Sequence, residues 1–149
     1  MCVAQALHWF DLERFYAEAR RVMKPGAVIA AWGYTRHHVT PEIDAAFQEH
    51  FLEPVKPYWP PQNAKLWAGY REVPFPFELV EAPELAIERR WTLAQLIDYA
   101  GTWSATRRYL EVSPGFLEGA HAAMEPTWGK GERRVVSLPL SVRCGRHSP

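Results

Sequence analysis

A helix, a helix stop and a strand follow one another in residues 11–34, and this order constrains the fold more than any other feature. Asp11 is a candidate N-cap for the helix. Pro25-Gly26 ends the helix, because proline cannot continue it and glycine accepts the exit angles. Residues 27–32 are then continuously apolar, which is typical of a strand buried on both faces of a parallel sheet. Within the predicted helix, the apolar residues are spaced so that they lie on one face: Leu12, Phe15, Tyr16, Ala19, Val22 and Met23.

Four stretches are distinctive when taken together: AQALHWFD at 4–11, ERFYAEARRVMKPGAVIAAWGY at 13–34, RWTLAQLIDYAGTWSATRRY at 90–109 and RRVVSLPLSVRCGR at 133–146. Their combination resembles class I S-adenosylmethionine-dependent methyltransferases, and more narrowly the methyltransferase type 11, trans-aconitate methyltransferase-like group. In that family a K-P-G-G turn ends the helix, whereas this chain has Ala27 in place of the second glycine. The resemblance implies an α/β fold: the C-terminal half of a Rossmann-like methyltransferase fold, with a mixed sheet and flanking helices. It also implies that the last strand runs antiparallel to the strand at 27–32.

The glycine-rich loop that runs along the cofactor in this family has no counterpart in the chain, since no GxGxG occurs in it. Residues 1–7 have the pattern of the end of a strand, with no turn or cap before it. We therefore expect a C-terminal fragment that forms one partial methyltransferase domain, 1–149. Within it, 1–34 would be a strand–helix–strand core, 35–77 a helix plus a proline- and aromatic-rich lid, and 78–149 the closing strands and helices.

Candidate site residues lie at the carboxyl end of the first predicted strand. Ligands of open α/β sheets bind beyond the carboxyl ends of the strands, and the resemblance implies that Gln5, Ala6 and Trp9 lie along the cofactor, S-adenosyl-L-methionine. His8 is the candidate catalytic residue, either as a substrate hydrogen bond or as a general base. The alternative is structural: Trp9 and Phe10 would pack under the following helix, with Phe10 as a hydrophobic staple.

Residues 54–77 contain six prolines, which exclude a long helix and a central strand. Long loops of this kind often cover functional sites, so the segment is interpreted either as a lid over the substrate or as a stiff flap whose aromatic side chains hold it to the core. Core packing of Trp103 and solvation of Arg107 are open alternatives to a substrate role. The candidate substrate-binding residues are Tyr34, Trp59, Tyr70, Trp103 and Arg107.

The C-terminal part alternates short strands and helices. Residues 78–91 have strand patterns interrupted by Pro83, and Thr92 with Gln95 forms a capping box for a helix expected to continue past Gly101 to Tyr109. A weaker helix is predicted at 116–128. Apolar residues alternate in 136–144, which predicts a final strand. Pro139 cannot donate a ladder hydrogen bond, so this strand is predicted to be an edge strand or to contain a bulge.

Charge and cysteine content limit the binding partners and the cellular compartment that we expect for the protein. Lys+Arg and Asp+Glu are both 17, so no net field would attract nucleic acid or an anionic membrane. The two cysteines are isolated, which suits a reducing compartment, and no signal peptide or membrane-spanning run is found. His37 and His38 lack metal-ligand spacing. We expect a cytoplasmic protein that binds no metal and takes a small-molecule substrate, with an exposed sheet edge through which a homodimer could form.

The resemblance implies S-adenosylmethionine-dependent methyl transfer to a small molecule, with a carboxylate or a hydroxyl as the acceptor. Such an enzyme mainly aligns the nucleophile with the methyl group. An ionised carboxylate needs no base, whereas a hydroxyl could use His8, and Arg71 or Arg107 could hold a carboxylate. Two alternatives stay open: a non-catalytic, truncated remnant that lacks the glycine-rich cofactor loop, and a small-ligand-binding module that uses the aromatic lid.

Overall fold

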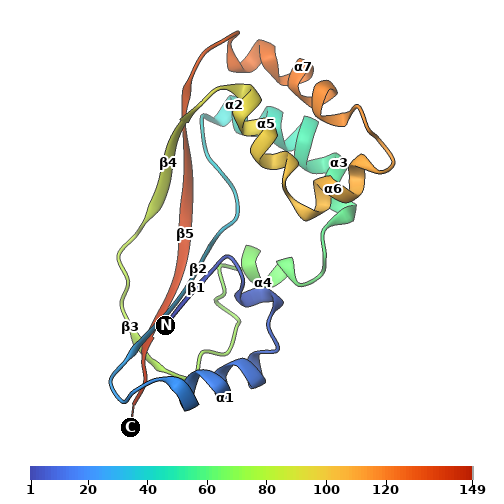
Figure 1. Ribbon diagram of the computed structural model, residues 1–149. Coiled ribbons are helices and arrows are strands. Elements are labelled where there is room, and N and C mark those ends of the chain that lie inside the picture. The colour runs from blue at the N-terminus through green and yellow to red at the C-terminus, as the bar shows by residue number, and fades with distance from the viewer. Residues whose placement is uncertain (149) are drawn as a thin grey trace. The chain divides into compact units, whose positions relative to one another are not determined.

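Two compact units make up the computed structural model, which describes residues 1–148 (Figure 1). Unit 1 contains residues 1–36, 62–87 and 138–148, and unit 2 contains residues 37–61 and 88–137. The chain therefore passes from one unit to the other four times. The division expected from the sequence (1–34, 35–77 and 78–149) follows chain order, whereas the two units interleave.

The sheet is mixed, as predicted. Its strand order is β1-β2-β5-β3, and β4 also pairs with β5. Strands β1 and β2 are parallel, with Ala4 opposite Trp32, whereas β5 is antiparallel to both β2 and β3. In Figure 1 the long β5 runs alongside β2. The expected antiparallel last strand is thus confirmed. The strands are β1 Cys2–Ala4, β2 Val28–Tyr34, β3 Glu78–Val80, β4 Ala86–Trp91 and β5 Arg134–Arg146.

Pro139 lies where the β5 ladder is irregular. The pairing of β2 with β5 ends at Tyr34 and Leu140, and an isolated bridge joins His38 to Ser137. Between these pairs three residues, 35–37, face two residues, 138 and 139. This count is that of a β-bulge, where a residue without a backbone N–H is tolerated. Of the two sequence alternatives for Pro139, the structure supports the bulge.

Helix α1, Leu12–Val22, packs on the unit 1 core. The Asp11 carboxylate accepts a hydrogen bond from the Arg14 N–H at 3.2 Å, which confirms the predicted N-cap. Gly26 has φ 80°, a backbone angle that glycine adopts without strain. Val22 was predicted to face the core but is 50% exposed. The prediction was wrong because Val22 lies at the edge of the apolar stripe, which is centred on Tyr16 and Ala19.

The unit 1 core joins β1, β2 and α1 to the segment after α4 (Asn63–Trp67). Tyr70 and Phe77 from that segment are buried, so the proline-rich flap is held here by its aromatic side chains, as one sequence alternative proposed. The buried residues of this core are Val3, Leu7, Tyr16, Ala19, Ile29, Ala31, Leu66, Tyr70, Val73 and Phe77.

Unit 2 is built mainly from helices around a second core. Its helices are α2 Pro41–Phe47, α3 Glu53–Val55, α5 Leu93–Gly101, α6 Ser104–Leu110 and α7 Phe116–Trp128, with a π-helical turn at Gln48–Leu52 and a 3-10 turn at Lys56–Tyr58. Thr40 caps α2, and Pro41 occupies its first turn, as expected. The weaker helix predicted at 116–128 is also confirmed.

The helix predicted to run from 93 to 109 is broken, and this prediction was wrong. Helix α5 ends at Gly101, and Trp103 has extended backbone angles (φ −66°, ψ 144°) before α6 begins. The carbonyl groups freed at the end of α5 are satisfied locally. The Thr102 hydroxyl donates to the Tyr99 carbonyl at 2.7 Å, and the Thr106 hydroxyl donates to the Ala100 carbonyl at 2.8 Å. The backbone N–H groups of Thr102 and Trp103 also donate to these two carbonyls, at 3.1 and 3.2 Å. Threonine side chains and these tighter backbone bonds together replace the helical bonds that the break removes.

Candidate functional site

Gln5 turns the chain at the carboxyl end of β1. Its φ is 51°, in the left-handed region that non-glycine residues rarely adopt. The backbone N–H of Gln5 donates to the Trp32 carbonyl at 2.8 Å. The side-chain amide donates to the Tyr34 carbonyl and accepts from the Tyr34 N–H, both at 2.9 Å. Gln5 therefore continues the ladder with its side chain, while the backbone turns into the 3-10 helix η1, Leu7–Trp9.

A buried pair of polar rings lies next to this turn. His8 is 3% exposed, and its Nδ1 lies 3.0 Å from the Tyr70 hydroxyl oxygen. Tyr70 is fully buried and also has a left-handed φ, 57°. The Arg143 guanidinium on β5 donates to the carbonyl groups of Tyr70 and Arg71 at 3.2 and 3.3 Å. Gln5 and Tyr70, which both have left-handed backbone angles, thus lie close together beside Gly33. Strained residues of this kind are common at functional sites.

Gly33 on β2 lies against three side chains of this arrangement. A Cβ at this position would lie 2.4 Å from Leu66 Cδ1, 3.0 Å from Gln5 Oε1 and 3.1 Å from the Tyr70 hydroxyl oxygen. No side chain fits there without movement of its neighbours. In the sequence, Gly33 only marked the end of the predicted strand. The residues next to it do not indicate that three side chains from other parts of the chain contact it.

The electrostatics keep both rings of the pair neutral near neutral pH. Burial lowers the pKa of His8 below its ordinary value, and the positive charge of Lys65 acts in the same direction. Burial raises the pKa of Tyr70 to about 12. An uncharged imidazole bonded to an uncharged phenol can donate or accept one further hydrogen bond, and it carries no charge of its own to bind an ion.

The residues after β1 differ in how they are exposed. Trp9 is 50% exposed, and its ring centroid lies 4.9 Å from that of His8. Phe10 packs against Phe15 at 4.9 Å, the geometry of a hydrophobic staple. The packing alternative thus holds for Phe10, whereas half of Trp9 remains available to a ligand. Ala6 is partly buried against the unit 1 core.

The structure brings most of the predicted site residues together in unit 1. Gln5 bonds to Tyr34, and His8 contacts both Trp9 and Tyr70. The burial of Tyr70 places its hydroxyl against His8 and away from any exposed surface. The remaining candidates belong to unit 2: Trp59 and Trp103, whose rings lie 5.6 Å apart, and Arg107, which is exposed. The cofactor, substrate and catalytic roles of all these residues remain predictions.

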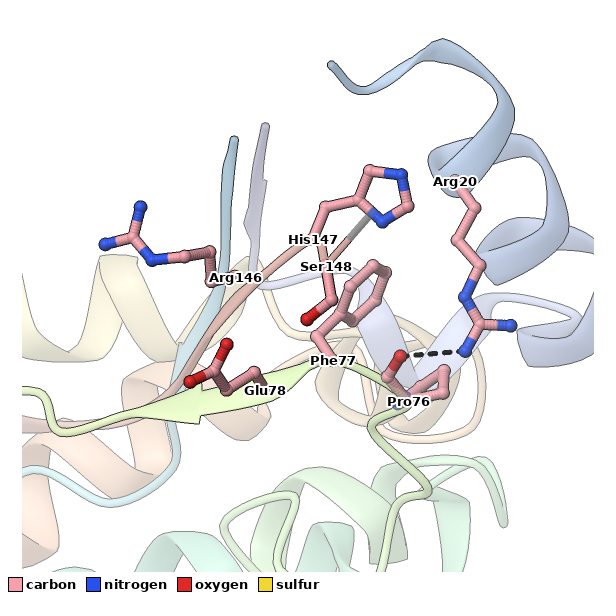
Figure 2. Close-up of a pocket in the computed structure, with 7 residues that line it drawn as sticks. All are labelled: Arg20, Pro76, Phe77, Glu78, Arg146, His147 and Ser148. Carbon is pink, nitrogen blue, oxygen red and sulfur yellow. Dashed lines mark hydrogen bonds between the residues drawn. The ribbon is translucent and has the colours of Figure 1, made fainter. Parts of the chain in front are cut away.

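A hollow of about 320 Å³ lies at the other end of the strands (Figure 2). Arg146, which lines it, pairs with Val28 at the amino end of β2. Figure 2 shows the Arg20 guanidinium bonded to the Pro76 carbonyl, at 2.8 Å. Arg146 donates to the Gly26 carbonyl at 2.9 Å. Both guanidinium groups thus bind backbone oxygens, and the Glu78 carboxylate shares the hollow with them.

Two kinds of feature are absent from residues 1–148. No three of their His, Cys, Asp and Glu side chains are grouped so that they could hold a metal ion. None of their helices combines the length and the apolar character needed to cross a membrane.

Comparison with known proteins gives two informative matches, although no family model matches the chain. A Dictyostelium discoideum protein named "Putative methyltransferase" is 25% identical over 146 residues, which cover 93% of this chain and 56% of that protein. A solved structure from Anaeromyxobacter dehalogenans, described as "a Putative Type II Methyltransferase", is 42% identical with a TM-score of 0.88. That match covers 99% of this chain and 64% of the other. The chain thus spans less than two thirds of the length of either relative.

Fold and site together define a Rossmann-like α/β protein with its candidate site beyond the carboxyl ends of two parallel strands. Both matches bear methyltransferase names, and the predicted resemblance to class I S-adenosylmethionine-dependent methyltransferases is confirmed. The narrower likeness to the trans-aconitate methyltransferase group stays a prediction.

Proposed function

We propose that the chain contributes to the active site of an S-adenosylmethionine-dependent methyltransferase acting on a small molecule with a carboxylate or hydroxyl acceptor. One observation carries the proposal: the strained turn after β1 presents His8 and Trp9 at the carboxyl end of paired parallel strands. The chain that does so is 42% identical, over 99% of its length, to a structure described as a methyltransferase. When bound, S-adenosylmethionine supplies an electrophilic methyl group on a positively charged sulfur.

The residues present fit one side of such a cofactor. Trp9 exposes half of its indole beside the turn, and the face of an indole attracts cations and stacks on planar rings. Residues 1–149 contain no GxGxG loop. Trp9, with the backbone around Gln5 and Ala6, would therefore form one wall of the cofactor site.

The chain's own contribution to catalysis is orientation. Alignment of a nucleophile with an electrophilic carbon replaces a bimolecular encounter with an effectively unimolecular one. The bonds of Gln5 to Tyr34 and of His8 to Tyr70 hold the turn in one conformation. A substrate oxygen bound by His8 would then be held in a fixed orientation. Few water molecules would reach it, because His8 itself is buried.

Calorimetric titration of the purified chain with S-adenosylhomocysteine tests this proposal. We expect saturable binding, together with a cooperative thermal melt. Trp9→Ala should weaken binding about tenfold, since an aromatic contact with a cation or planar ring contributes on the order of 1–2 kcal/mol. Trp9→Phe should retain most of the affinity.

Leu79→Ala is the matched control. Leu79 is 64% exposed on β3 and pairs with Gly145, so the variant removes an exposed apolar side chain at the other end of the strands. We expect it to bind S-adenosylhomocysteine as the unaltered chain does. A cooperative melt without any binding would contradict the proposal.

A further inference from the structure

We infer that Tyr70 is a positioning residue that holds His8 in the tautomer with its hydrogen on Nε2, so that His8 presents an N–H donor and not a general base. The catalytic meaning of this inference rests on the proposed function. The tautomer itself rests only on the geometry of two side chains that lie 62 residues apart in the sequence.

The Tyr70 hydroxyl must find its hydrogen-bond acceptor inside the protein. The side chain is fully buried, and a buried phenol O–H requires an acceptor. In the part of the chain that the structure describes, the bond to this hydroxyl is made by His8 Nδ1, at 3.0 Å. Because burial raises the pKa of Tyr70 to about 12, the phenol keeps its proton near neutral pH and must donate it.

The His8 imidazole can accept from this hydroxyl in only one of its two neutral tautomers. A neutral histidine carries one N–H, and its other nitrogen is an acceptor. If Nδ1 carried the hydrogen it would donate to the phenol oxygen, and the buried phenol proton would lose its acceptor within residues 1–148. If Nδ1 is the acceptor, both groups are satisfied and the hydrogen lies on Nε2. The bond at one ring nitrogen thus sets the state of the other.

The charge of His8 also decides whether its ring can accept this hydrogen bond. A protonated His8 would carry hydrogens on both nitrogens and could no longer accept from Tyr70. Burial and the nearby Lys65 ammonium both lower the pKa of His8. The neutral ring, and with it the bond from Tyr70, is therefore favoured near neutral pH.

The tautomer is held only if the phenol cannot turn away from His8. Arg143 donates to the Tyr70 carbonyl, and the Tyr70 N–H donates to the Lys65 carbonyl at 3.0 Å. The preceding Gly69 also has a left-handed φ, 63°. At its tip, the Tyr70 hydroxyl lies 3.1 Å from where a Gly33 Cβ would be. The backbone of Tyr70 is thus held by these hydrogen bonds, and the full burial of its side chain restricts rotation of the phenol.

The consequence is a division of roles. His8 Nε2–H would donate to a substrate oxygen and remove no proton from it. This arrangement suits a nucleophile that is already ionised. A hydroxyl that must lose a proton would need a base other than His8.

Nitrogen NMR of the ¹⁵N-histidine-labelled chain near neutral pH tests the tautomer directly. His8→Gln identifies the His8 signals among the six histidines by their loss. We expect Nε2 to give the signal of a protonated ring nitrogen, and Nδ1 that of an unprotonated nitrogen that accepts a hydrogen bond. A protonated Nδ1 in the neutral ring would overturn the inference.

A pH titration of the same signals tests the role of Tyr70. Protonation of Nδ1 would leave the buried phenol O–H without its acceptor, so the phenol opposes it. Tyr70→Phe should therefore raise the pH at which His8 protonates, by on the order of one unit. Tyr109→Phe, in unit 2, is the control and should leave the His8 titration unchanged. An unchanged or lowered midpoint in Tyr70→Phe would contradict the positioning role.

These measurements are separable from the test of the proposed function, because they use no cofactor. Failure to bind S-adenosylhomocysteine would refute the proposed function and leave the tautomer standing. If Tyr70→Phe does not fold, the ring signals of the unaltered chain still decide between the two tautomers.

Discussion

Gly33 is the single residue whose substitution should disturb the site most. Leu66, Gln5 and Tyr70 all lie within about 3 Å of the position that a Cβ would take. Leu66 and Tyr70 also belong to the unit 1 core, so an added methyl group would displace packing and site geometry together.

Gly33→Ala should lower the free energy of unfolding by about 1–3 kcal/mol, as overpacking of a core does. Denaturant unfolding measures this change. Gly119→Ala is the matched control, because Gly119 lies in α7 with no atom within 4 Å of the added Cβ. That variant should be neutral or gain up to about 1 kcal/mol from helix propensity. Equal stability of the two variants would contradict the packing argument.

His8 should make stability depend on pH. Its folded pKa lies below the ordinary value of 6.5, so as the pH falls the unfolded chain takes up a proton before the folded chain does. The unfolded state then binds more protons, and stability declines as the pH falls below 6.5 towards the folded pKa. Above 6.5 the contribution is complete. Thermal melts between about pH 5 and pH 8 should show a smaller acid-side decline for His8→Gln than for the unaltered chain. A parallel decline in both would contradict this assignment.

At the scale of single elements, most helix ends are determined by local side chains. The capping box of α5 is complete: the Gln95 N–H donates to the Thr92 hydroxyl at 3.3 Å, and the Thr92 N–H donates to the Gln95 side chain at 3.0 Å. Both residues lie within one turn of each other, which is why the sequence predicted this start correctly. The end of α5 depends instead on Thr106 and Trp103, which lie beyond the helix.

Thr92→Ala should cost about 1 kcal/mol, because the substitution leaves the Gln95 N–H in the first turn of α5 without its acceptor. Chemical unfolding followed by circular dichroism measures the loss. Thr127→Ala serves as the control, since Thr127 is exposed inside α7 and caps no helix. The control should stay within about 0.5 kcal/mol of the unaltered chain. A Thr92→Ala loss no larger than that of the control would show that the box contributes nothing.

On the scale of the whole molecule, each of the two units has a core of its own. The buried residues of unit 1 and of unit 2 form separate clusters, each contributed by discontinuous segments of the chain. Units with separate cores can open with different free energies.

Leu96→Ala should therefore act mainly on unit 2. Leu96 is fully buried there, and removal of a buried leucine side chain costs about 2–5 kcal/mol. Amide hydrogen exchange should become faster in residues 37–61 and 88–137 than elsewhere. Leu85→Ala, at a position that is 49% exposed, should change exchange little. Equal acceleration in both units would show that they unfold as one.

What the sequence determines here is local: the Asp11 cap, the Pro25-Gly26 stop, the capping box at Thr92 and the period of the last strand. Each signal acts over a few residues, so it can be recognised without the fold. The family resemblance has the same origin, because it rests on short continuous motifs. Only the tertiary structure determined the contacts between residues that lie far apart in the sequence. Gln5 meets Tyr34 across 29 residues, His8 meets Tyr70 across 62, and Arg143 reaches Tyr70 across 73. Such pairs depend on strand register and chain crossing, which are determined only when the cores pack.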